Sequence, residues 1–137
     1  MLVNGLGCRQ TEAQWSFDYL HDHSREQEVS GGTMTTTARV VDGSVLVAAK
    51  LHSARETDLR DVLAVAEGID LETVTQHLRR GKEASLRAQL ERGLEILESD
   101  ELKHGFRSDF GDSAVSTATV SSLQEYLSEQ IEQLDQN

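Results

Sequence analysis

The chain has 137 residues, of which 37% are apolar and 4% aromatic, and these values fit one ordinary domain with a modest core. Its 24 acidic and 13 basic residues give a net charge of −11, which weighs against nucleic acid as a partner because phosphates bind Lys/Arg-rich surfaces. No stretch approaches the roughly 18 apolar residues of a membrane span, and residues 1–20 lack the basic start and apolar run of a signal peptide. We therefore expect a cytoplasmic protein with no membrane partner.

The charge is unevenly distributed along the chain. Residues 98–137 contain 9 acids and 2 bases, and only three of the 13 bases are Lys. This composition resembles that of proteins from extreme halophiles, and the charge itself indicates solubility rather than a function. The run Arg79-Arg80-Gly81-Lys82 is the local exception, which we interpret as the cationic end of a helix. The single Cys8 has no internal disulfide partner.

The N-terminal residues 1–37 are expected to be flexible or disordered, with one or two helical turns around Trp15. Ser30-Gly31-Gly32-Thr33, followed by a run of Thr residues, is typical of a flexible link. Met34 follows this link and is an alternative start of translation. Residues 38–41 are a possible short strand, ended by the turn dipeptide Asp42-Gly43.

Apolar periodicity then predicts four helices, separated by turn and capping residues. They cover 44–54 with Ser44 as N-cap, 58–67 with Thr57 or Asp58 as N-cap, 71–80 with Asp70 as N-cap, and 82–98. Residues 99–117 are expected to be a polar loop holding Phe106 and Phe110, and Thr119 caps a last helix over 120–134. The predicted fold is mainly α, with four or five helices and at most one short strand. We divide it into a flexible segment 1–37, a helical region 38–98, and an acidic loop and helix 99–137.

The most specific pattern lies at 45–62, where Lys50 stands near the edge of an apolar helix face. Arg55, Asp58 and Asp61 follow just beyond the end of this helix. Lys50 can pair with an acid of the next helix and hold the corner, remain exposed, or face a phosphate. Pairing or plain exposure is the preferred interpretation, because isolated ion pairs are common.

Two other patterns suggest sites but lack the expected surroundings. Gly43-Ser44 and Glu56-Thr57-Asp58 have the residue types of a phosphate-holding turn and a Mg²⁺-binding acid pair. An apolar helix-like run separates them, however, and the acids precede a helix pattern where a strand is required. The pair His21 and His23 could bind a metal, but no third ligand stands at a recognisable spacing, so we interpret the histidines as solvent-facing.

The segment 45–81 resembles the C-terminal part of small nucleotidyltransferase-like proteins, including minimal nucleotidyltransferases and their relatives in toxin–antitoxin systems. In that family a strand is followed by a Leu-x-x-x-Lys-Leu helix, an Arg and two Asp residues, and then a two-helix unit. The matching positions here are Lys50, Leu51, Arg55, Asp58 and Asp61, with 38–41 as the strand. The resemblance covers residues 38–98 and implies that these charged positions are structural or ligand-facing.

The same resemblance implies a catalytic Gly-Ser and Asp-x-Asp on an N-terminal sheet, which residues 1–37 do not resemble. The chain is therefore expected to be a non-catalytic fragment or descendant of such a protein, with no cofactor or metal and no catalytic residue. It would act through helix-mediated protein interaction. The alternative is a small acidic module of a halophile that homodimerises through amphipathic helices, over 82–98 and 119–134. A third hypothesis is a Mg²⁺-dependent nucleotidyltransferase that uses Ser44 and Asp58.

Overall fold

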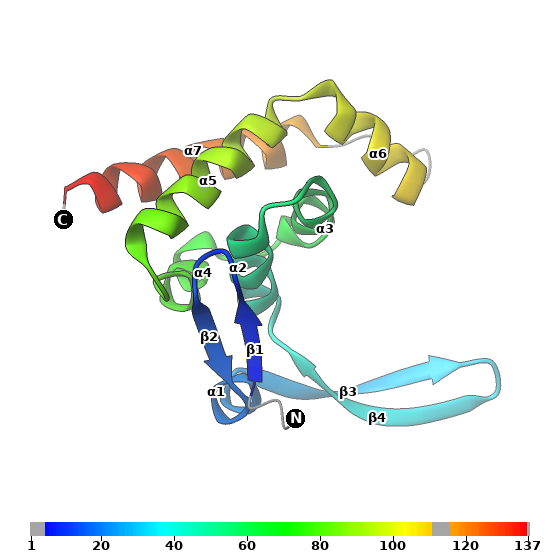
Figure 1. The fold of residues 1–137 in the computed structure, drawn as a ribbon. Helices are drawn as coiled ribbons and strands as arrows, with labels where there is room; N and C mark the ends of the chain where they lie inside the picture. Colours follow the sequence, from blue (N-terminus) through cyan, green and yellow to red (C-terminus); the bar gives the residue numbers. More distant parts are fainter. Residues whose placement is uncertain (1–4, 111–115, 137) are drawn as a thin grey trace.

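The computed structural model describes residues 5–110 and 116–136, which form two β-hairpins followed by a helical body (Figure 1). The N-terminal part contains β1 (Gly5–Cys8), β2 (Ala13–Ser16), α1 (Phe17–Asp22), β3 (Ser24–Gly31) and β4 (Met34–Val41). The helical body contains α2 (Gly43–Ser53), α3 (Glu56–Ala66), α4 (Leu71–Leu78), α5 (Glu83–Leu97), α6 (Asp100–Phe110) and α7 (Thr117–Asp135). Among the described helices, none is both long and apolar enough to cross a membrane.

This architecture shows that the predicted fold class is wrong. The described residues contain seven helices and two antiparallel two-stranded sheets, in place of four or five helices with at most one strand and a flexible N-terminal segment. The Gly-Gly-Thr run is the turn of a hairpin in which Gly31 pairs with Met34, and the expected strand 38–41 is the end of β4. Gly32 there has φ 62°, a conformation that glycine adopts without strain.

The expectation of a loop over 99–117 is wrong for residues 100–110, which form α6. Asp100 and Glu101 lie in its first turn, where the helix dipole favours acids, and Leu102 and Phe106 are four residues apart on its buried side. Gly105 makes this helix hard to predict from the sequence, because glycine is a poor helix former. The remainder of the expected loop includes 111–115, which lie outside the described residues.

The other helices follow the predicted order with shifted ends. Asp70 caps α4 as predicted, since its side chain accepts a hydrogen bond from the Glu72 N–H (3.0 Å). The N-caps of α2, α3 and α7 are Asp42, Arg55 and Ser116 in place of the predicted Ser44, Thr57 or Asp58, and Thr119.

The core joins all the described helices from α2 to α7. α5 and α7 lie side by side in opposite directions over α2, α3 and α4 (Figure 1). Their leucine stripes face into one cluster with the apolar faces of α2–α4. A smaller cluster of Cys8, Ala13 and Trp15 attaches the β1–β2 hairpin to the body. The β3–β4 hairpin extends away from both (Figure 1).

Candidate functional site

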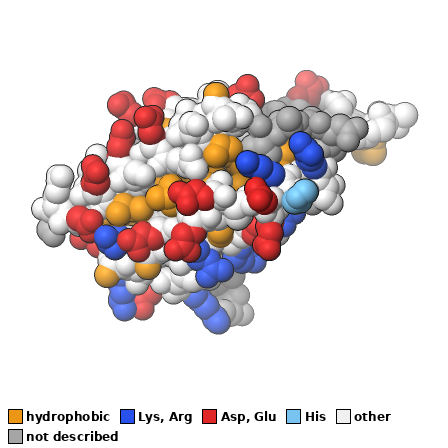
Figure 2. All heavy atoms as spheres, turned by 90° about the horizontal axis from the view of Figure 1, so that it is seen from above, with side chains coloured by type: hydrophobic (Ala, Val, Ile, Leu, Met, Phe, Trp, Pro, Cys, Tyr) orange, Lys and Arg blue, Asp and Glu red, His pale blue; other side chains and the backbone are white. Residues whose placement is uncertain are grey.

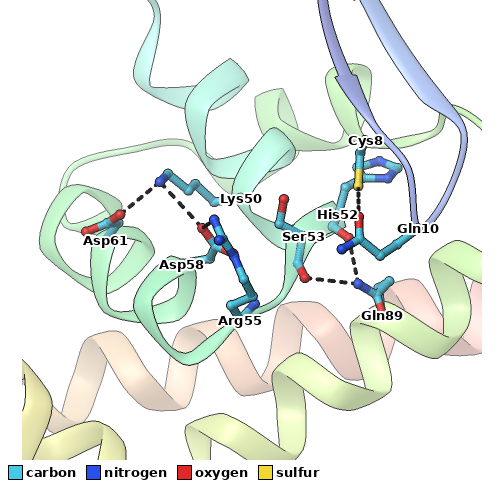
Figure 3. Close-up of polar contacts among 9 residues, drawn as sticks. All are labelled: Cys8, Gln10, Lys50, His52, Ser53, Arg55, Asp58, Asp61 and Gln89. Carbon is cyan, nitrogen blue, oxygen red and sulfur yellow. Dashed lines mark hydrogen bonds and ion pairs between the residues drawn. The ribbon is translucent and has the colours of Figure 1, made fainter.

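The four charged residues singled out in the sequence meet at the corner between α2 and α3 (Figure 3). Lys50 lies in the last turn of α2, Arg55 is the N-cap of α3, and Asp58 and Asp61 follow in α3. The chain turns at Ala54, a buried residue with left-handed backbone (φ 48°, ψ 39°), whose N–H donates to the Lys50 carbonyl. The structure therefore brings these separate sequence positions into one cluster.

Asp58 is the centre of this corner, and it is only 1% exposed. Its carboxylate accepts hydrogen bonds from the backbone N–H of Arg55 (3.0 Å) and from Arg55 Nε (2.9 Å), which closes a capping box. The other carboxylate oxygen lies 3.5 Å from Lys50 Nζ. Burial acts to raise the pKa of Asp58, but the hydrogen bonds and charge of Arg55, with the charge of Lys50, outweigh it and lower that pKa.

Lys50 also reaches Asp61, with 2.9 Å between Nζ and Oδ2. The hydrogen bond from Asp61 raises the pKa of Lys50, against a smaller opposing effect of its partial burial. The Lys50 and Asp61 side chains are 29% and 43% exposed, and such pairs contribute little to stability. Asp58 is therefore the member of the cluster on which the corner depends most.

A third helix completes the corner. The side-chain amide of Gln89, on α5, donates to the carbonyls of His52 (2.8 Å) and Ser53 (3.0 Å) at the end of α2 (Figure 3). These are carbonyls that a helix end leaves without intrahelical partners. The corner thus fixes α2, α3 and α5 relative to one another.

A second cluster of polar residues, which the sequence did not reveal, lies under the β1–β2 hairpin. His52 is 0% exposed, and its Nε2 donates to the Leu78 carbonyl (2.7 Å). Its Nδ1 then accepts from the hydroxyl of Thr11 (2.7 Å), since a neutral imidazole carries one proton. The Trp15 and His52 rings are nearly perpendicular, with 5.1 Å between their centroids. Because Thr11 is also 0% exposed, a substrate cannot reach this hydroxyl, and the pair is a packing element.

His77 forms the outer part of the same cluster and is 1% exposed. Its carbonyl accepts from Trp15 Nε1 (2.9 Å), and its Nδ1 makes a short hydrogen bond with the Tyr19 hydroxyl. His23 lies beside both rings, and the Arg80 guanidinium stacks 4.0 Å from the centre of the Tyr19 ring. The interpretation of the histidines as solvent-facing is therefore wrong for His52 and His77.

The remaining sequence candidates do not form a joint site. Gly43 and Ser44 open α2, and Ser44 is 8% exposed, so this dipeptide lies in a helix and not in a phosphate-holding turn. Over the described ranges, His, Cys, Asp and Glu do not gather in a group of three or more that could hold a metal ion.

The two buried histidines predict a loss of stability on mild acidification. Burial lowers the pKa of both His52 and His77 from the ordinary value of 6.5, and the charge of Arg80 adds to this. Protons then bind the unfolded chain first, so the free energy of unfolding falls as the pH drops below about 6.5 and levels off below the folded-state pKa values. Urea unfolding between pH 7.5 and 5, with NMR titration of the imidazoles, measures this. His52→Gln and His77→Gln should each reduce this fall in the free energy of unfolding, and an unchanged pH dependence in both variants would contradict the prediction.

Compared with protein-family models, curated proteins and solved structures, the chain finds no match in any of the three.

Proposed function

We propose that this chain is a non-catalytic relative of the C-terminal helical part of nucleotidyltransferase-like proteins, and that it acts by binding a protein through its helices. The corner supports the first half of this proposal. Lys50, Arg55 and Asp58 sit at the positions that match the family motif, and their charged groups contact one another. Asp58 is 1% exposed, so it is available to Arg55 and Lys50 and not to a ligand. The same burial weighs against Asp58 as a Mg²⁺ ligand of an active transferase.

The observation that carries the second half is a pair of grooves along α7. One, of about 520 Å³, runs between α4 and α7, and the other, of about 580 Å³, lies between α5 and α7. Glu125 and Glu129 line both grooves and form the ridge between them. Their other acidic lining residues are Glu72, Glu98 and Glu132, and neither groove has Lys or Arg among the described residues that line it.

The partner that fits these grooves is a basic amphipathic segment. Figure 2 shows acidic side chains spread over the face formed by α5 and α7, with apolar side chains between them. Leu71 and Tyr126 line one groove and Leu94 the other, so each offers apolar surface beside carboxylates. The leucine stripes of α5 and α7 are already buried against each other within one chain, which leaves the acidic side of α7 for a partner.

Reversing the acidic charge along α7 is expected to weaken the binding of such a segment. We expect the triple substitution Glu125→Lys, Glu129→Lys and Glu132→Lys to weaken binding of a fluorescein-labelled Arg/Leu amphipathic peptide at least about tenfold, measured by fluorescence anisotropy. Binding to the unmodified chain should also weaken with added salt, because these carboxylates are exposed. The matched control, Asp18→Lys, Glu67→Lys and Glu101→Lys, changes the net charge equally away from α7. Equal loss in both triple variants would contradict a specific site.

The proposal that the chain is non-catalytic is tested separately. Calorimetric titration of the chain with Mg²⁺ and each nucleoside triphosphate should give no heat of binding. Saturable, Mg²⁺-dependent binding that is lost in Ser44→Ala would favour the transferase hypothesis instead.

A further inference from the structure

The β3–β4 hairpin is an arm that reaches beyond the helical body (Figure 1). Its eight residue pairs run from Ser24 opposite Val41 to Gly31 opposite Met34. All its residues are exposed except Ser24 and Ala38, which are half-buried. A two-stranded hairpin is at best marginally stable in water, and a sheet of three or more strands with an apolar face is needed for independent stability. The arm therefore lacks the support that a strand pair of this length normally has.

The two faces of the arm differ. On one face, Arg39 pairs with Glu26 (3.7 Å) and donates to the Ser24 hydroxyl (3.2 Å), and the Ser30 and Thr35 hydroxyls are hydrogen-bonded (3.1 Å). The register places a second set of residues on the opposite face. Its apolar members include Val29, Met34 and Val40, which are 46%, 76% and 38% exposed.

The two free edges also differ. β3 carries three charged side chains, Arg25, Glu26 and Glu28, which protect an edge from pairing with another strand. β4 has the sequence Met-Thr-Thr-Thr-Ala-Arg-Val-Val, with one charge and five β-branched residues of high strand propensity. β4 is therefore the edge that is suited to pairing.

The charge of the arm permits a close approach of two copies. Residues 24–41 contain two Glu and two Arg, so the arm is neutral within a chain of net charge −11. Two acidic bodies repel each other, but two neutral arms can pair along their length without bringing the acidic faces of the bodies into contact. This argues for a second copy of this chain as the occupant of the β4 edge.

We propose that β4 pairs with β4 of a second copy in antiparallel orientation, with Thr37 opposite Thr37 at the two-fold axis. This register places Met34 opposite Val40 and Thr36 opposite Ala38, so the apolar faces of both arms lie on the same side. Two registers of seven opposed positions keep like faces together, centred on Thr37 or on Ala38, and only the first pairs the exposed Met34. The result is a symmetric four-stranded sheet in which Val29, Met34 and Val40 of both arms lie on the same face.

The first test is the oligomeric state and its response to a charge at the axis. Sedimentation equilibrium should give a dimer of twice the 15.2 kDa chain mass, and we expect dimerisation to strengthen with salt. Thr37→Lys places two like charges opposite each other in the dimer, whereas within one arm the new Lys faces Glu28. We expect it to raise the dimer dissociation constant at least about tenfold. The control Gln27→Lys adds the same charge on β3 and should leave the constant nearly unchanged.

Cysteine cross-linking tests the register. Thr37→Cys should form a disulfide-linked dimer on mild oxidation, because residues opposite each other lie within disulfide reach. Thr35→Cys should not, because its counterpart is displaced by four residues, about 13 Å along the strand. A monomer at every concentration up to about 1 mM, a dimer insensitive to Thr37→Lys, or equal cross-linking by both cysteine variants would overturn the proposal. The α7 charge-reversal variant should dimerise normally, so this proposal and the proposed function can fail separately.

Discussion

Gly81→Ala is expected to detach the N-terminal hairpin from the body and to lower the free energy of unfolding by about 3–5 kcal/mol. Gly81 has φ 74°, where a side chain is strained, and a Cβ would lie 2.2 Å from the Thr11 carbonyl oxygen. That oxygen accepts a hydrogen bond from the Lys82 N–H (2.8 Å), so the hairpin cannot stay in place when a methyl group enters. Trp15, the only tryptophan, belongs to β2 of this hairpin and is 1% exposed, so its fluorescence should shift to longer wavelength when the hairpin detaches.

Gly68→Ala is the matched control for this substitution. Gly68 also has positive φ, 87°, but a Cβ there meets nothing within 4 Å. It should therefore cost only the backbone strain, about 1 kcal/mol, with no change in Trp15 emission. Urea unfolding followed by circular dichroism and by fluorescence separates the two variants. Equal losses of stability would show that the contact with Thr11 is unimportant.

Asp58→Ala should have the next largest effect, a loss of about 2–3 kcal/mol. It removes the capping box of α3 and leaves the backbone N–H of Arg55 without its acceptor at a tightly packed corner. Asp61→Ala removes a half-exposed partner of Lys50 and should cost less than about 1 kcal/mol. Denaturant unfolding of both variants measures the difference, and a larger loss in Asp61→Ala would contradict the central place of Asp58.

Asp58→Ala should also change how the free energy of unfolding depends on pH under acidic conditions. The pKa of Asp58 is lowered on folding, so its contribution is fully present above the ordinary value of 3.8 and is lost as the pH falls through the folded-state pKa. Asp58→Ala should flatten this region. This pH range lies below the one in which His52 and His77 take up protons, so the carboxylate and histidine contributions can be measured separately.

The sequence supports the prediction of elements whose apolar residues recur at helical spacing. The sequence predicts α4 and α5 because the apolar residues of each helix lie on one face, toward the core. These residues are Val74 and Leu78 in α4, and Leu86 and Leu90 in α5. The sequence does not predict the β3–β4 arm, because most of its residues are exposed and do not alternate between apolar and polar, and a Gly-Gly run is also typical of a linker. The N-cap of α3 was missed because Arg55 accepts no capping hydrogen bond typical of Ser, Thr, Asp or Asn, and the carboxylate of Asp58 supplies the contact instead.

The candidate site could be predicted only in part for a related reason. Lys50 and Asp61 are eleven positions apart on consecutive helices, so a pairing across the corner follows from local geometry. The burial of His52 depends on Thr11 and on the Leu78 carbonyl, 41 and 26 positions away. No local pattern encodes such contacts, and His52 looks like any histidine near the end of a helix.

The attachment of the β1–β2 hairpin has a consequence for the order of folding. Its anchors are the His77 carbonyl for Trp15 and the Thr11 carbonyl for the Lys82 N–H, which join positions 62 or more residues apart. Closing a loop of that length is entropically costly until the helices between have condensed. The β1–β2 hairpin precedes these helices in the sequence, and we expect it to dock late, after α2 and α4 have packed together and formed the surface that it contacts.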